Sequence, residues 1–131
     1  MEAKLTVLSE SSRTKRKKIL KKIAEIIRRE KEFLIASHEN PEGDAIGSIL
    51  ALGMGLRKMG KKVTIFNPDP IPEIIMFLPG AGKVIRRVPK NRRFDAAFAL
   101  DCGDPKRLGD AFPKPERIKR LINVDHHASN T

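Results

Sequence analysis

The sequence predicts an α/β protein in which helices cover both faces of a parallel β-sheet. Short apolar segments alternate along the 131 residues with segments of helical periodicity, and this alternation is typical of repeated strand–helix units. The chain contains no internal repeat, low-complexity tract or linker. Its length corresponds to one domain or to part of one.

The first expected element is a helix over residues 13–31. Its apolar residues recur at helical spacing, and Lys and Arg fill the remaining face. These apolar residues are Ile19, Leu20, Ile23, Ile26 and Ile27. The segment "EFLIASH", residues 32–38, then predicts a buried strand. Residues 44–60 predict a second helix, which Gly60 closes.

Three further strands are expected in the second half of the chain. They are residues 61–67, "KKVTIFN", residues 94–101, "FDAAFALD", and residues 120–126, "RLINVDH". A proline-rich stretch after the first of these predicts a short helical turn at 72–78. Residues 83–88, "KVIRRV", are a weaker strand candidate.

The composition excludes several classes of protein. Hydrophobic residues make up 40% of the chain and charged residues 33%, as in globular rather than disordered chains. No apolar run approaches the ~20 residues of a membrane span, and the N-terminus lacks the apolar core of a secretory signal. The single cysteine, Cys102, excludes an internal disulfide and fits a cytoplasmic location.

The chain carries a formal net charge of +11, from 27 Lys and Arg against 16 Asp and Glu. This excess indicates anionic partners such as nucleic acid, nucleotides or phosphate. Basic solvated faces are also common in thermophile proteins, and six Phe with no Trp or Tyr offer few platforms for stacking bases. The charge is therefore compatible with a nucleic-acid partner without requiring one.

Polar residues follow three of the predicted strands. His38 ends the first segment, Asp101 the third, and Asp125, His126 and His127 the fourth. Ligands of parallel α/β sheets bind at the carboxyl ends of the strands. Independent structural uses need not place all these side chains at the same edge, so the pattern favours a functional site there.

Imidazole and carboxylate groups in one cluster suit Mn²⁺, Zn²⁺ or Fe²⁺, whereas an all-oxygen site favours Mg²⁺ or Ca²⁺. Glu42 and Asp44 belong to one tight turn and can serve two neighbouring ions, which Asp101 can bridge. Two such ions activate water and clamp the oxygens of a displacement at phosphorus. The helix that starts near Asp44 points its N-terminal amides toward an anion.

The segments "HENPEGDAIGS", "ALDCGD" and "NVDHHASN" resemble, in order, the first three motifs of the DHH phosphoesterase superfamily. They are most similar to its bifunctional nanoRNase/pAp phosphatase branch, and the resemblance covers residues 15–131. It implies a Rossmann-like DHH catalytic domain, of which residues 1–131 are the N-terminal part. It also implies a site for two Mn²⁺ ions, with Mg²⁺ or Co²⁺ as substitutes.

The resemblance further implies roles for individual residues. One ion would be held by His38, Glu42 and Asp101. The other would be held by Asp44, Asp101 and His126.

The remaining motif residues would act on the substrate or support the ligands. His127 would lie beside the scissile phosphate, and Asp125 would be a supporting carboxylate of the catalytic centre. Asn40 and Ser48 would shape the loop or contact the substrate.

The implied reaction is hydrolysis of very short RNA, of 3′-phosphoadenosine 5′-phosphate (pAp), or of both, by metal-activated water. The expected partners are nucleotides or short RNA and not a membrane, and a homodimer is an open alternative to a monomer. Two other functions stay open. One is that of another DHH-type phosphodiesterase, acting on cyclic dinucleotides or as a single-strand exonuclease. The other is that of a non-catalytic basic module that binds nucleotides or RNA.

The sequence departs from the family pattern in two places. Glu42 stands where the first motif usually has aspartate, so the ion at this position would be displaced or held more loosely. The chain stops at Thr131, before the fourth metal-ligand aspartate and the smaller substrate-binding domain of the family. We therefore expect the 131 residues alone to have weak activity or none.

Overall fold

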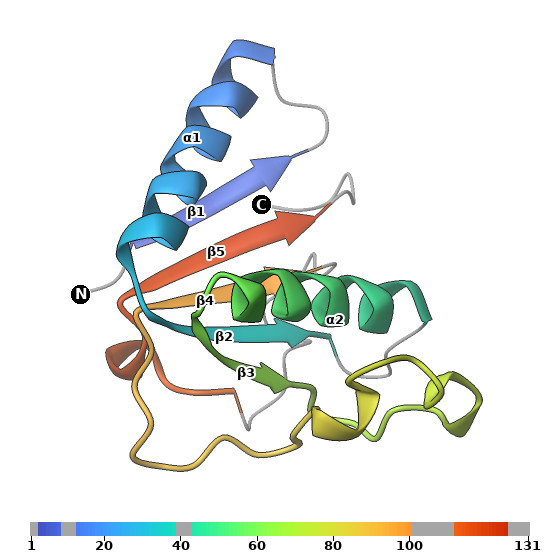
Figure 1. Cartoon of the computed structure of the whole chain (residues 1–131). Coiled ribbons are helices and arrows are strands. Elements are labelled where there is room, and N and C mark those ends of the chain that lie inside the picture. The colour runs from blue at the N-terminus through green and yellow to red at the C-terminus, as the bar shows by residue number, and fades with distance from the viewer. Residues whose placement is uncertain (1–2, 9–12, 39–42, 101–111, 126–131) are drawn as a thin grey trace.

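The computed structural model describes residues 3–8, 13–38, 43–100 and 112–125. These residues form a five-stranded sheet with two long helices packed on it (Figure 1). Among the described helices, none is both long enough and apolar enough to cross a membrane. In chain order the elements are β1 (Ala3–Leu8), α1 (Arg13–Arg29), β2 (Glu32–Ser37), α2 (Gly43–Lys58), β3 (Lys62–Phe66), the 3-10 turns η1 (Glu73–Ile75) and η2 (Ala81–Lys83), β4 (Ala96–Leu100), the 3-10 turn η4 (Pro115–Arg117) and β5 (Arg120–Asp125).

All neighbouring strands of the sheet are parallel, in the order β1-β5-β4-β2-β3. This confirms the α/β class and the four predicted strands. The sequence patterns did not predict β1, which pairs with β5 from Ala3 opposite Arg120 to Leu8 opposite Asp125. Because β5 lies at the other end of the chain, the residues of β1 alone give little indication that β1 forms a strand.

Two weaker expectations concern the segment between β3 and β4. The predicted helical turn is present as η1. Residues 83–88 do not form a strand; only Ile85 joins the sheet, through an isolated parallel bridge to Phe66. The Ile85 N–H donates to the Ile65 carbonyl at 2.8 Å, and the Ile85 carbonyl accepts from the Asn67 N–H at 3.0 Å. One residue thus extends the sheet beyond β3.

The order of the strands creates a topological switch point between β2 and β4. From β2 the chain passes through α2 to β3 on one side, whereas β4 is followed by β5 on the other side. β2 and β4 pair directly, and their last residues, Ser37 and Leu100, lie opposite each other. Ligands of open parallel sheets bind outside the carboxyl ends of strands at such a point.

Both long helices pack against the same face of the sheet (Figure 1). The cluster joins Ile23 and Ile26 of α1 and Ile49 of α2 to the strand residues Phe33 and Phe98. Leu20, which the helical spacing placed with the apolar residues of α1, is 51% exposed. The basic residues of α1 occupy its outer face, as the sequence predicts.

The opposite face of the sheet carries a second apolar cluster. Leu34, Ala36 and Phe66 pack there with Phe94 and Ile118. Helices were expected on both faces, but in the described part of the chain loops and the region of η4 cover this one. Strand residues are therefore buried on both sides, which explains their continuous apolar runs.

Two glycines of α2 make a matched pair for a test of its packing. A Cβ on Gly53 would lie 2.6 Å from Cδ1 and 3.3 Å from Cγ1 of Ile65, whereas a Cβ on Gly55 would meet nothing within 4 Å. We expect Gly53→Ala to lower the free energy of unfolding by about 1–3 kcal/mol through overpacking. Gly55→Ala should raise it by about 0.5–1 kcal/mol through helix propensity. Urea unfolding of both variants checks this, and equal shifts would contradict close packing of α2 on β3.

Candidate functional site

The carboxyl edge of the sheet is the place where the predicted site residues follow their strands. Ser37 pairs with Leu100, and Leu100 pairs with Val124. The strands that precede His38 and Asp101 in the sequence therefore end side by side, next to the end of β5 at Asp125. Figure 1 shows β2, β4 and β5 pointing to one side of the molecule.

The structure describes only some of the predicted site residues. His38, Asp44, Ser48 and the backbone of Asp125 are described. The predicted residues Asn40, Glu42, Asp101, His126 and His127 lie outside the described residues. Within the described ranges, no three His, Cys, Asp or Glu side chains gather closely enough to hold a metal ion. The predicted ligand set stays a prediction.

The first residues of this edge are buried and polar. His38 is only 6% exposed, and Ser37 is fully buried. The Ser37 hydroxyl has no hydrogen-bond partner among the described residues. Buried hydroxyl groups in native proteins nearly always have a partner, so the edge beside His38 suits a polar or ionic neighbour.

Asn67 is a residue of this edge that the sequence patterns did not single out. It follows β3, and its buried side chain donates from Nδ2 to the His38 carbonyl at 3.0 Å. Its Oδ1 accepts from the Asp69 N–H at 2.9 Å, while its own N–H is held by Ile85. Asn67 thus ties the end of β3 to the first residue after β2. An Asn–Pro pair directly after an apolar strand is the only local signal for it.

We expect Asn67→Ala to lower the free energy of unfolding by about 1–3 kcal/mol, because the buried His38 carbonyl loses its donor. The same variant should weaken Mn²⁺ binding, since the backbone that carries His38 is no longer fixed. Asn91→Ala, at an exposed position, is the matched control and should change neither quantity. Thermal unfolding and calorimetric titration measure the two effects. Unchanged metal affinity in a destabilised Asn67→Ala protein would limit Asn67 to a structural role.

The start of α2 forms another part of this edge. The helix begins at Gly43, between the predicted ligands Glu42 and Asp44, so its first N–H groups are available to an anion. Asp44 is exposed, and its carbonyl accepts a hydrogen bond of 2.9 Å from the Ser48 hydroxyl. This contact lies within the helix. Ser48 therefore bonds to the backbone of the turn that carries the two acids.

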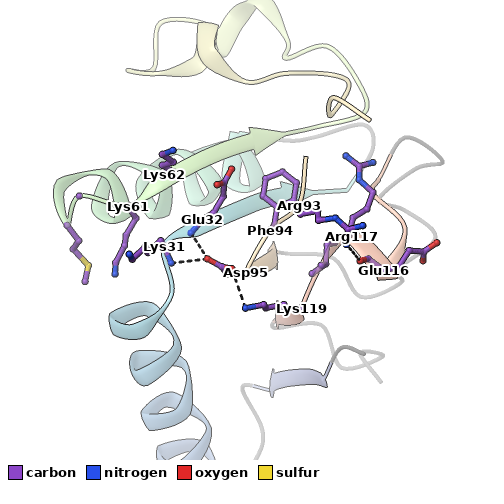
Figure 2. Close-up of a pocket in the computed structure, with 13 residues that line it drawn as sticks. Lys31, Glu32, Lys61, Lys62, Arg93, Phe94, Asp95, Glu116, Arg117 and Lys119 are labelled. Atoms are coloured by element: carbon purple, nitrogen blue, oxygen red, sulfur yellow. Dashed lines mark hydrogen bonds and ion pairs between the residues drawn. The ribbon is translucent and has the colours of Figure 1, made fainter. Parts of the chain in front are cut away.

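A hollow of about 940 Å³ lies at the opposite, amino-terminal edge of the sheet (Figure 2). It is formed by the loops that lead into β2, β3, β4 and β5. Its basic lining residues are Lys31, Lys61, Lys62, Arg93, Arg117 and Lys119, and its acidic ones are Glu32, Asp95 and Glu116. Of the predicted site residues that the structure describes, none lines this hollow, which lies at the other edge of the sheet from the end of β2.

Several basic side chains of this hollow hold loops together. Lys61 Nζ donates to the carbonyls of Arg28 and Glu30, at 3.1 and 2.8 Å, where α1 ends. Arg117 Nε donates to the Arg92 carbonyl at 2.9 Å. Because these donors are committed to backbone carbonyls, the basic lining has a structural use of its own.

Asp95 lies at the centre of this arrangement (Figure 2). Its Oδ2 accepts from the N–H groups of Lys31 and Glu32 at 3.1 and 3.0 Å, and Lys119 Nζ lies 3.7 Å from Oδ1. Burial acts to raise the pKa of Asp95, but the two backbone hydrogen bonds and the charge of Lys119 outweigh it. The net result is a pKa below the ordinary value of 3.8.

We expect Asp95→Ala to lower the free energy of unfolding by about 1–2 kcal/mol at pH 7, because two N–H groups lose a charged acceptor. The pKa of Asp95 is lower in the folded than in the unfolded chain. Its stabilising contribution is therefore present above the unfolded pKa and is lost as the pH falls through the folded pKa. Denaturant unfolding from pH 7 to pH 2 should show the variant and the wild type converging in acid. Glu116 is an exposed acid of the same hollow, and Glu116→Ala should have the same free energy of unfolding as the wild type at every pH.

Comparison with known proteins gives a consistent result for most of the chain. Residues 32–131 match the DHH family, N-terminal domain. The bifunctional oligoribonuclease and PAP phosphatase NrnA of Thermus thermophilus is 35% identical over 109 residues, which are 82% of this chain and 32% of that protein. The crystal structure of an exopolyphosphatase-related protein from Bacteroides fragilis matches with a TM-score of 0.73 and 25% identity, over 83% of this chain and 34% of that one. The chain thus spans about a third of the length of the relatives it matches.

Proposed function

The chain belongs to the DHH family, and on that premise we propose that it forms the metal-binding part of a phosphoesterase that hydrolyses very short RNA, pAp, or both. The switch point between β2 and β4 carries this proposal. His38 directly follows β2, and Asp101 follows Leu100, the residue that pairs with the end of β2. The likeness to a relative named as an oligoribonuclease and PAP phosphatase supports the choice of substrates.

The proposed ligands fit divalent transition metals by their chemistry. His38 and His126 offer imidazole nitrogen, and Glu42, Asp44 and Asp101 offer carboxylate oxygen, a combination suited to Mn²⁺. The burial of His38, beside a Ser37 hydroxyl that has no partner among the described residues, supports a polar centre at this edge. When bound, two such ions supply a water of lowered pKa and offset the charge of the phosphate.

The residues of the chain itself bind and orient the substrate in this proposal. The first N–H groups of α2, at Gly43 and Asp44, are placed to donate to phosphate oxygens. His127 donates an imidazole N–H to an oxygen of the scissile phosphate. Asn67 keeps the backbone at His38 in place through its hydrogen bond. The net charge of +11 favours the approach of an anionic substrate.

Release of AMP from pAp and from a diadenylate RNA tests this function in the longest protein that the gene encodes. We expect release in Mn²⁺, none after chelation, and recovery when Mn²⁺ is added back. Hydrolysis that persists after chelation would contradict the proposal. RNA binding without turnover in any metal would favour the non-catalytic binding module instead.

A further inference from the structure

Three large apolar side chains are exposed on the segment that follows β3, and Met76, at 44%, is the least exposed of them. Ile74 is 82% exposed and Phe77 is 79% exposed. The chain has six Phe and no Trp or Tyr, and all six Phe are described. Of the other five, four are buried and one is partly buried: Phe33, Phe66, Phe94, Phe98 and Phe112. Phe77 is therefore the only Phe of the chain whose ring is well exposed.

This segment is a series of tight turns that holds its shape. The N–H groups of Ile75, Met76 and Leu78 donate to the carbonyls three residues earlier, at 3.0, 3.1 and 3.2 Å. In such turns the side chains at i and i+3 lie on one side. Ile75 and Leu78 pack against the main core cluster, which leaves Ile74 and Phe77 on the outer side. Their exposure is thus built into an anchored segment.

The segment stands at the carboxyl edge of the sheet. It leaves β3 on the side to which β2, β4 and β5 also point (Figure 1). Ile75 Cγ2 lies 3.7 Å from the position that a Cβ on Gly43 would occupy. Gly43 lies between Glu42 and Asp44 in the sequence. The segment that carries the exposed pair therefore lies, through Ile75, next to the start of α2 and the two proposed metal ligands that flank Gly43.

We propose that Phe77 is a positioning residue of the proposed site, a platform on which a nucleobase of the substrate stacks. Metal ions at this edge would hold phosphate, and the base of a nucleotide lies only a ribose away from its phosphate. An exposed aromatic ring beside such a site binds any base through its π-face, without reading the sequence. Ile74 extends the apolar surface next to the ring. This inference rests on the proposed function, because it needs a nucleotide held at the carboxyl edge.

Two small ligands distinguish the contribution of the base to binding from that of the phosphate. AMP and ribose 5-phosphate share the sugar and the phosphate, and AMP is a product of both proposed substrates. Calorimetry in Mn²⁺ with the longest protein that the gene encodes gives both affinities. We expect Phe77→Ala to weaken AMP binding by about 5- to 150-fold, the range for loss of one base–aromatic stack. Ribose 5-phosphate affinity should stay within about twofold, and Phe77→Trp should keep or improve AMP affinity.

Met59→Ala is the matched control, because Met59 is 54% exposed and lines the hollow at the amino-terminal edge. It should leave both affinities unchanged. Unchanged AMP affinity in Phe77→Ala, or an equal loss of affinity for AMP and ribose 5-phosphate, would contradict stacking of the base on Phe77. A change of oligomeric state in Phe77→Ala, with unchanged AMP affinity per subunit, would overturn it in favour of a contact between copies of the chain. If the wild type binds neither AMP nor ribose 5-phosphate in Mn²⁺, the proposed phosphoesterase function is contradicted, and so is the base-stacking role of Phe77 that depends on it.

Discussion

Replacement of Asp101 by Ala is expected to remove most of the affinity of the protein for Mn²⁺. In the proposed site Asp101 contacts both ions, so its loss removes a ligand from each. Changes in residues that only support metal ligands typically cost 10–100-fold in affinity, and a shared ligand should cost more than about 100-fold. Glu42→Asp keeps a carboxylate and should have a much smaller effect. Calorimetric titration of each variant with Mn²⁺ measures the difference.

Asp95→Ala serves as the control for this comparison. Asp95 is also an acid next to β4, but it precedes the strand at the amino-terminal edge, where it bonds to the backbone of Lys31 and Glu32. Its removal should leave Mn²⁺ affinity unchanged in the folded protein. Equal affinity of the wild type and Asp101→Ala would contradict the shared-ligand assignment.

The second large effect concerns the size of the protein that is assayed. The chain spans about a third of the relatives it matches, and we expect residues 1–131 alone to turn over pAp or diadenylate RNA very slowly. Positioning of the reactants can account for ~7–11 kcal/mol of barrier lowering. Loss of half of that would reduce the rate by roughly 4 × 10²- to 10⁴-fold. Where the gene encodes a longer protein with a further domain, phosphate and AMP release by the two proteins in Mn²⁺ measures the ratio.

The comparison requires that the short chain is folded, which circular dichroism and the urea transition of the same sample establish. Turnover by folded residues 1–131 at a rate close to that of the longer protein would contradict this expectation. It would mean that the switch-point edge alone positions the phosphate.

Much of the fold could be predicted from local patterns. β2 and β4 are apolar on both faces, and α2 is bounded by a turn motif and by Gly60, whose φ of 81° is accessible to glycine. These signals lie within each element. The order of the strands and the burial of both sheet faces then place the ends of β2, β4 and β5 at one edge.

Other features depend on contacts between distant parts of the chain. β1 forms by pairing with β5, and Asn67 acquires its role only when β3 lies beside β2. Asp95 likewise falls inside the strand expected over residues 94–101 and has no partner that local spacing predicts, yet its Oδ2 accepts hydrogen bonds from the N–H groups of Lys31 and Glu32. Local sequence patterns cannot show such partners, because the partners are more than twenty residues away in the sequence.

The position of bound Mn²⁺ tests the central proposal most directly, because this ion broadens the NMR signals of nearby amides. Titration of ¹⁵N-labelled protein should first broaden the signals of Ser37, Leu100 and Val124, which flank the carboxyl edge. The signals of Lys31, Asp95 and Lys119, which line the hollow at the amino-terminal edge, should stay sharp, and Asp101→Ala should abolish the selective broadening. Broadening at the amino-terminal edge, or no selective broadening at stoichiometric Mn²⁺, would contradict a metal site at the switch point between β2 and β4.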